Sequence, residues 1–144
     1  TDTVYGLAAD AFRPAAVQRL LEAKESGRDV PPTVLIPGIP TLNALAENVP
    51  EPVDALVKRF WPGPLTIIVE ARESLAWDLG ETGGVLGGSV PGGAVVGDGD
   101  PAAAASTVVD ATSLHLPEGR LRILRDGAVT REAIVDVVGA ELVA

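Results

Sequence analysis

Apolar residues recur at helical spacing in four segments of the chain. In residues 13–27, Val17, Leu20 and Leu21 share one face, and Pro14 suits the first turn. Two shorter helices are predicted next, and the last helix combines a cap with an apolar face. The two shorter helices are residues 41–49, with Thr41 as the N-cap, and residues 50–61. The last helix is 130–142, with Thr130 as its N-cap. Its apolar face consists of Ala133, Ile134, Val137 and Val138.

Apolar and β-branched runs bounded by turn residues predict the strands. The runs are residues 3–12, 31–38, 65–71, 106–112 and 120–127, and the first of them ends in a turn. The stretch from Gly80 to Pro101 is rich in glycine and lacks a regular period, so no element is predicted there. "WPGPLT" forms a rigid turn, with Trp61 assigned to the core. Helices alternate with strands only in part, which predicts an α/β or α+β fold with a twisted mixed sheet and flanking helices.

Composition narrows the class of protein. The 144 residues fit one domain that is large enough to bury a core, and aromatic residues make up only 3%. A net charge of −9 argues against a general nucleic-acid binder, although a local basic pocket is compatible with it. The chain has no cysteine, which excludes a thiol nucleophile or a cysteine-ligated metal. Its apolar runs are too short to span a bilayer, so we expect a cytoplasmic protein.

The opening residues "TDTVYGL" place two threonines and an aspartate at the start of an apolar run. Their side chains could cap a turn or bond to the local backbone. Alternatively, the Thr3 hydroxyl faces a small polar ligand. Local evidence leaves both interpretations open.

Basic side chains offer a second kind of candidate site. Lys24 and Arg28 lie one turn apart at a predicted helix end, where they could either complement the helix dipole or clamp a triphosphate. Arg125, beside Gly127, could meet a nucleotide phosphate or be solvated. By the two-residue period of a strand, Arg120 and Arg122 share one face and Arg125 lies on the other.

The remaining candidates are weaker. Ser106 begins a strand, where serine is common, and His115 is expected to be an exposed loop residue rather than a catalytic base. Asp98 and Asp100 in "GDGDP" suggest a cation site but lack the full spacing of a calcium loop. The glycine-rich stretch contains no phosphate-binding GxxxxGK[ST] motif.

Six motifs in order make the chain resemble the YrdC-like family, the threonylcarbamoyl-AMP synthases. They are "TDTVYGLAADA", "LLEAK", "PPTVLI", "FWPGPLTIIV", "ASTVVDAT" and "LRILRDGAVT". The resemblance implies a twisted α/β sheet with a concave basic surface. It also implies a reaction in which L-threonine, bicarbonate and ATP give threonylcarbamoyl-AMP and pyrophosphate, with Mg²⁺ on the phosphates. The product then passes to tRNA-modifying transferase proteins, with tRNA as a further partner.

The resemblance also implies roles for individual residues. Thr3 and Ser106 match positions that contact the substrate threonine. Lys24 matches the helix-end lysine beside the ATP phosphates, and Arg125 matches an arginine that lies against the nucleotide. The family usually has Lys-x-Arg at the helix end, whereas this chain has Ser26 there, so Arg28 is expected to take over the phosphate contact.

A larger departure lies near Val85 and Leu86. After "TGGV" the family continues into a strand, a helix and a Ser-Ala-Asn segment, and this sequence has none of them. We therefore expect residues 1–144 to form one YrdC-like domain from which an N-terminal lead-in and this internal segment are absent. A true loss of the internal segment would leave strand edges unpaired.

Two other functions are compatible with the same fold. The chain could be a non-catalytic RNA- or tRNA-binding module, although its acidic balance argues against this. It could also belong to a carbamoyl-transfer enzyme, but such domains occur in larger chains with zinc modules, and this segment has no cysteine. Threonine-dependent pyrophosphate release distinguishes the synthase from an RNA-binding module.

Overall fold

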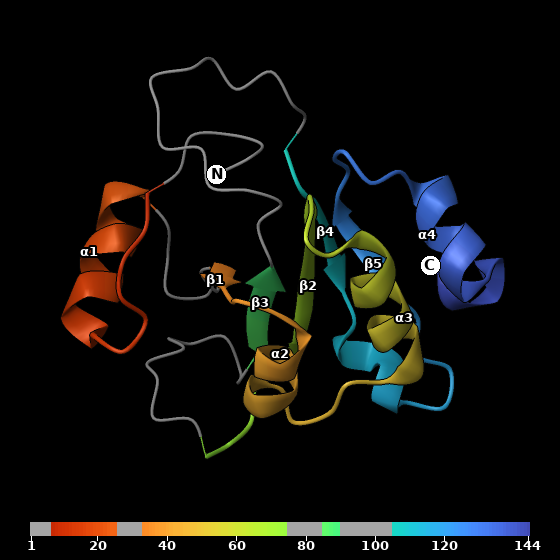
Figure 1. The fold of residues 1–144 in the computed structure, drawn as a ribbon, viewed down its shortest axis with the longest axis horizontal. Helices are drawn as coiled ribbons and strands as arrows, with labels where there is room; N and C mark the ends of the chain where they lie inside the picture. The colour runs from red at the N-terminus through yellow and green to blue at the C-terminus, as the bar shows by residue number, and fades with distance from the viewer. Residues whose placement is uncertain (1–6, 26–32, 75–84, 90–104) are drawn as a thin grey trace.

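A five-stranded mixed sheet organises the residues that the computed structural model describes, 7–25, 33–74, 85–89 and 105–144 (Figure 1). Its strands lie in the order β1-β3-β2-β4-β5. Central β2 pairs parallel with β4 and antiparallel with β3, which confirms the predicted mixed sheet. The strands are β1 (Thr33–Leu35), β2 (Leu65–Glu70), β3 (Val85–Ser89), β4 (Thr107–Asp110) and β5 (Arg122–Arg125).

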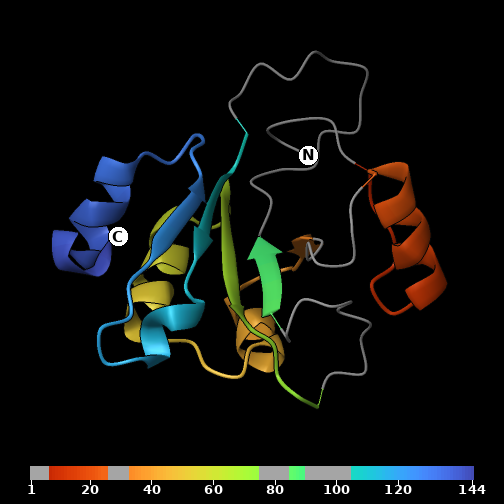
Figure 2. The ribbon, with the colours of Figure 1, turned by 180° about the vertical axis from the view of Figure 1, so that it is seen from behind.

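Helices lie at both ends of this sheet. Figures 1 and 2 show α3 and α4 near β4 and β5, and α1 apart from the sheet, beyond β1. The helices are α1 (Pro14–Ala23), α2 (Ile39–Leu45), α3 (Glu51–Phe60) and α4 (Arg131–Val138), with short 3₁₀ turns at Thr112–His115 and Ala140–Leu142.

Local chemistry explains the two helices that cover the sheet. Acidic side chains occupy the first turn of α3 and basic ones its last turn, which complements the helix dipole. The first residue of α4 follows Thr130, whose hydroxyl accepts a hydrogen bond from the Ala133 amide at 3.2 Å. The cap predicted at Thr130 is therefore confirmed. The apolar side chains of α3 pack against β2, and α4 packs against α3, so both helices contribute to one core.

The core lies between that face and α3 and α4. Leu65, Ile67 and Val69 alternate along β2 and are buried together with Leu56 of α3 and Ile134 of α4. This burial contributes roughly 1.5–3 kcal/mol for each large side chain.

The turn before β2 is part of this core. Trp61 is only 8% exposed, and its indole N–H donates to the Leu65 carbonyl at 2.8 Å. A Cβ added to Gly63 would lie 2.4 Å from the Phe60 carbonyl oxygen, so glycine is required there. The core assignment of Trp61 and the structural role of "WPGPLT" are both confirmed.

Several element predictions need correction. Thr41 is not an N-cap, because α2 starts earlier: Gly38 is its N-cap, and Pro40 sits in the first turn, where its missing N–H is not needed. The glycine-rich stretch contains β3, whose side-chain alternation is hidden by its glycines but whose backbone pairs with both β1 and β2. α1 ends at Ala23, whereas the expected stop at Gly27 lies outside the described residues.

Candidate functional site

The second face of the sheet points away from α3 and carries the candidate site. Because Leu65, Ile67 and Val69 point into the core, Thr66 and Ile68 of β2 must point to the opposite face. In β4, Val109 is a core residue, so Val108 and Asp110 share the face of Thr66. We call this surface the far face of the sheet.

A β-bulge brings two arginines to the far face. Arg122 pairs with Asp110 and Arg125 pairs with Val108, with a shift of register between Val108 and Val109. The extra residue on β5 reverses the side-chain alternation, and directly paired residues project from the same face. The prediction that Arg122 and Arg125 lie on opposite faces is therefore wrong.

Arg125 contacts Ser106, which directly precedes β4. The guanidinium donates to the Ser106 carbonyl oxygen twice, from Nε at 3.0 Å and from Nη2 at 2.8 Å. Ser106 is half-buried, whereas Arg125 is exposed. The structure thus brings together two of the five predicted site residues, at the edge of the sheet where β4 begins.

Further contacts hold residues 105–107, which we call the serine segment. The Thr107 hydroxyl donates to the Val129 carbonyl at 2.6 Å and accepts from the Val129 amide at 3.0 Å. The Ala128 amide donates to the Ala105 carbonyl, and the Thr107 amide donates to the Pro64 carbonyl, both at 3.0 Å. The serine segment is therefore fixed by the loop after β5 and by the turn before β2.

Thr66 is a polar residue of the far face that sequence reasoning missed. It is only 5% exposed, and no hydrogen bond joins its hydroxyl to another described residue. Its partner across the sheet is Val108, which in turn faces Arg125. The available signal was its place in "LTIIVE", where a threonine alternates with core residues. The motif "WPGPLT", which contains Thr66, is mainly structural and therefore hides this signal.

The other candidates do not join this cluster in the described part of the chain. Lys24 is the exposed C-cap residue of α1, and Thr3 and Arg28 lie outside the described residues, as do Asp98 and Asp100. His115 is 50% exposed, as expected, and its Nδ1 lies 2.7 Å from the Thr112 carbonyl oxygen. The described residues contain neither a cluster of three or more His, Asp or Glu placed to hold a metal nor a helix able to span a membrane.

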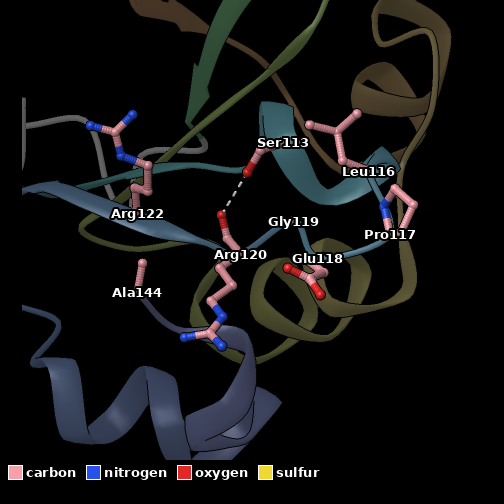
Figure 3. Close-up of a pocket in the computed structure, with 8 residues that line it drawn as sticks. All are labelled: Ser113, Leu116, Pro117, Glu118, Gly119, Arg120, Arg122 and Ala144. Carbon is pink, nitrogen blue, oxygen red and sulfur yellow. Dashed lines mark hydrogen bonds between the residues drawn. The ribbon is translucent and has the colours of Figure 1, made fainter.

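A cavity of about 630 Å³ lies away from the serine segment (Figure 3). Its lining includes Ser113, Glu118, Arg120 and Arg122, and the Ser113 hydroxyl donates to the Arg120 carbonyl at 2.8 Å. In Figure 3 the side chains of Arg120 and Arg122 point in different directions, although both line this cavity and both are exposed on either side of buried Leu121. None of the predicted substrate residues lines this cavity.

The fold and the far face define an α/β protein whose mixed sheet carries the Thr66 hydroxyl on central β2 and the guanidinium groups of Arg122 and Arg125 on edge strand β5. The chain belongs to the Sua5/YciO/YrdC family, since the family model described as "Telomere recombination" matches residues 1–97. The resemblance stated from the motifs is therefore confirmed.

Individual relatives support the same assignment. A Mycobacterium leprae protein with the provisional name threonylcarbamoyl-AMP synthase is 36% identical over 181 positions, covering 96% of this chain and 80% of the relative. The threonylcarbamoyl-AMP synthase of Pyrococcus abyssi is 45% identical over 73 residues, covering 51% of this chain and 22% of the relative.

Solved structures share the fold. The H234A/Y235A variant of P. abyssi Sua5 superposes with a TM-score of 0.84 at 26% identity. P. abyssi Sua5 complexed with L-threonine superposes with a TM-score of 0.79, also at 26% identity. Both comparisons cover 100% of this chain but only 53% and 54% of the Sua5 chain. The chain thus spans about half the length of these structural relatives.

Proposed function

We propose that this chain is the synthase domain of a threonylcarbamoyl-AMP synthase. It would use L-threonine, bicarbonate and ATP, and release threonylcarbamoyl-AMP and pyrophosphate. The observation that carries the proposal is the contact between Arg125 and Ser106 at the edge of the sheet. It joins two residues that the family motifs assign to the substrates, in a chain whose fold is similar to that of Sua5 complexed with L-threonine.

The proposed reaction forms two bonds. The threonine amine attacks the carbon of bicarbonate or CO₂ to give a carbamate, with loss of water when bicarbonate reacts. A carbamate oxygen then attacks the α-phosphorus of ATP, and pyrophosphate leaves with the electron pair of the broken P–O bond. Such a transfer depends mainly on positioning the reactants and stabilising phosphate charge, so hydroxyl and guanidinium groups suffice.

Each site residue has a proposed role in this chemistry. The hydroxyls of Thr3 and Ser106 bind L-threonine, and the cations of Lys24, Arg28 and Arg125 face ATP. Mg²⁺ is expected to bind through the ATP phosphates, which are its preferred partners in nucleotide sites. The concave basic surface and transfer of the product to tRNA-modifying proteins remain part of the proposal.

We also propose that the natural protein contains a further segment near Val85 and Leu86. The alignment with the M. leprae relative spans 181 positions, 37 more than the 144 residues of this chain. The intact mass of the protein isolated from its source tests this. We expect a mass several kilodaltons above 14.7 kDa, whereas a mass equal to 14.7 kDa would refute the additional segment.

Pyrophosphate release tests the proposed function. The protein is incubated with ATP, and L-threonine and bicarbonate are omitted in turn. We expect release only when all three substrates are present, and a lower rate for Ser106→Ala, which removes the hydroxyl and little else. Arg59→Lys, on α3 and away from the far face, is the matched control and should keep the wild-type rate. tRNA binding without threonine-dependent release would instead support the RNA-binding module.

A further inference from the structure

We infer that Arg125 is a positioning residue, which orients Ser106 toward L-threonine. The inference rests on the proposed function, but it gives Arg125 a different task from direct contact with ATP. Two guanidinium donors, Nε and Nη2, already meet one acceptor, the Ser106 carbonyl oxygen, at 3.0 and 2.8 Å. Two donors of Arg125 therefore hold the backbone that carries the Ser106 hydroxyl.

Only arginine can make this contact from this position. The two N–H groups belong to one planar fork, so they fix the direction as well as the distance of the carbonyl. A lysine would keep the positive charge but present it as a single point without the fork. The contact also requires the bulge in β5, because without the shift of register Arg125 would point to the core face.

Gly127 provides an independent observation on the same segment. A Cβ added to Gly127 would lie 2.2 Å from the Ala105 carbonyl oxygen and 2.5 Å from the Thr107 nitrogen. The backbone of Gly127 thus packs directly against the serine segment, and any side chain there must displace it. Gly127→Ala removes neither a charge nor a hydrogen-bond donor, so its effect on binding would come from displacement of the serine segment.

These observations predict how substitutions at Arg125 and Gly127 change the binding of L-threonine and of ATP. Displacing the serine segment should weaken binding of L-threonine, although neither Arg125 nor Gly127 is assigned a contact with that substrate. Binding of ATP should be much less affected by Gly127→Ala, which leaves every cation in place. Arg125→Lys should act in the same way, since the positive charge near the nucleotide is retained.

The experiment measures dissociation constants for L-threonine and for ATP by calorimetry on the full chain. Arg125→Lys and Gly127→Ala are compared with Arg122→Lys, a control on the same strand and face with no hydrogen bond to the serine segment among those described. We expect roughly tenfold weaker threonine binding for the two test variants, the scale of one lost charge-assisted hydrogen bond, with ATP binding within about twofold of wild type. The control should match wild type for both ligands.

A Ser106→Ala background gives a second readout. If Arg125 acts through Ser106, adding Arg125→Lys to Ser106→Ala should weaken threonine binding by much less than it does in the wild-type background. Urea unfolding of each variant verifies that it is folded, and Arg125→Lys remains decisive if Gly127→Ala does not fold.

Two results would overturn the inference, and they are distinguishable. If wild type binds L-threonine and Arg125→Lys weakens only ATP binding, Arg125 is a direct nucleotide ligand and the proposed function stands. If wild type itself does not bind L-threonine, the proposed function fails and the positioning role fails with it.

Discussion

Replacing Thr107 with valine should destabilise the protein substantially although the two side chains have nearly the same shape. Thr107 is fully buried, and its hydroxyl both donates to and accepts from the backbone of Val129. Val129 is itself buried, so the substitution leaves an amide and a carbonyl without partners. Each unsatisfied buried group costs about 1–3 kcal/mol, and we therefore expect a loss of about 2–6 kcal/mol in the free energy of unfolding.

The chain offers a matched control for this substitution. Thr66 is also buried on a neighbouring strand, but its hydroxyl has no hydrogen bond to the described residues. Thr66→Val should therefore change the free energy of unfolding by less than about 1 kcal/mol, because it removes no hydrogen bond to a described residue. Urea unfolding followed by tryptophan fluorescence gives both values. The dependence of the free energy of unfolding on urea concentration is held common to all variants.

Comparing Thr107→Val with Thr66→Val can refute the role given to the Thr107 hydroxyl. If Thr107→Val and Thr66→Val destabilise the protein equally, the hydrogen bonds to Val129 are not what makes Thr107 important. Thr107→Ser provides a further check, since it keeps the hydroxyl and removes one methyl group. It should cost about 1 kcal/mol, clearly less than the valine variant.

Three further substitutions test the fold at separate places. Thr130→Ala removes the N-cap of α4 and should lower the free energy of unfolding by about 1 kcal/mol in urea unfolding, whereas Thr130→Ser should restore the wild-type value. Ile134→Ala leaves a cavity under α4 and should cost roughly 2–5 kcal/mol by the same assay; a loss below that range would mean that α4 packs loosely. Trp61→Phe removes the indole donor to Leu65 and should lower the thermal midpoint by several degrees, against no shift for the exposed control Leu35→Met.

Much of the fold was predictable because local signals agreed with the global arrangement. In α4, the cap at Thr130 and the apolar spacing around Ile134 both specify the helix that forms. The strand "LTIIVE" combines β-branched residues with a proline-rich turn, and it forms the central strand β2. Where cap, spacing and turn chemistry coincide, the sequence alone is sufficient.

The missed features depend on contacts between distant segments. Glycine gives no side-chain pattern, so β3 becomes visible only through its pairing with β1 and β2. The bulge at Leu124 likewise depends on how β5 meets β4, and a strict two-residue period therefore placed Arg125 on the wrong face. Register is a property of the strand pair, and a single segment does not contain it.

The candidate site shows the same division. The motifs singled out Ser106 and Arg125 separately, each with an ordinary structural alternative. Their direct contact across 19 residues of sequence could not be inferred from either motif alone. The two-residue period of the strand could have predicted the face on which Thr66 lies. The rigid turn beside it, however, offers a structural explanation for the same residue. The family motifs identify the candidate side chains, whereas the fold shows that Ser106 and Arg125 lie at the same edge of the sheet.

The most direct test of the proposed function is identification of the product. The protein is incubated with ATP, L-threonine and ¹³C-labelled bicarbonate, and the nucleotides are analysed by mass spectrometry. We predict threonylcarbamoyl-AMP that carries the isotope in its carbamoyl carbon and forms together with pyrophosphate. Unchanged ATP, or AMP without an attached threonylcarbamoyl group, would contradict the assignment of this chain as the synthase domain.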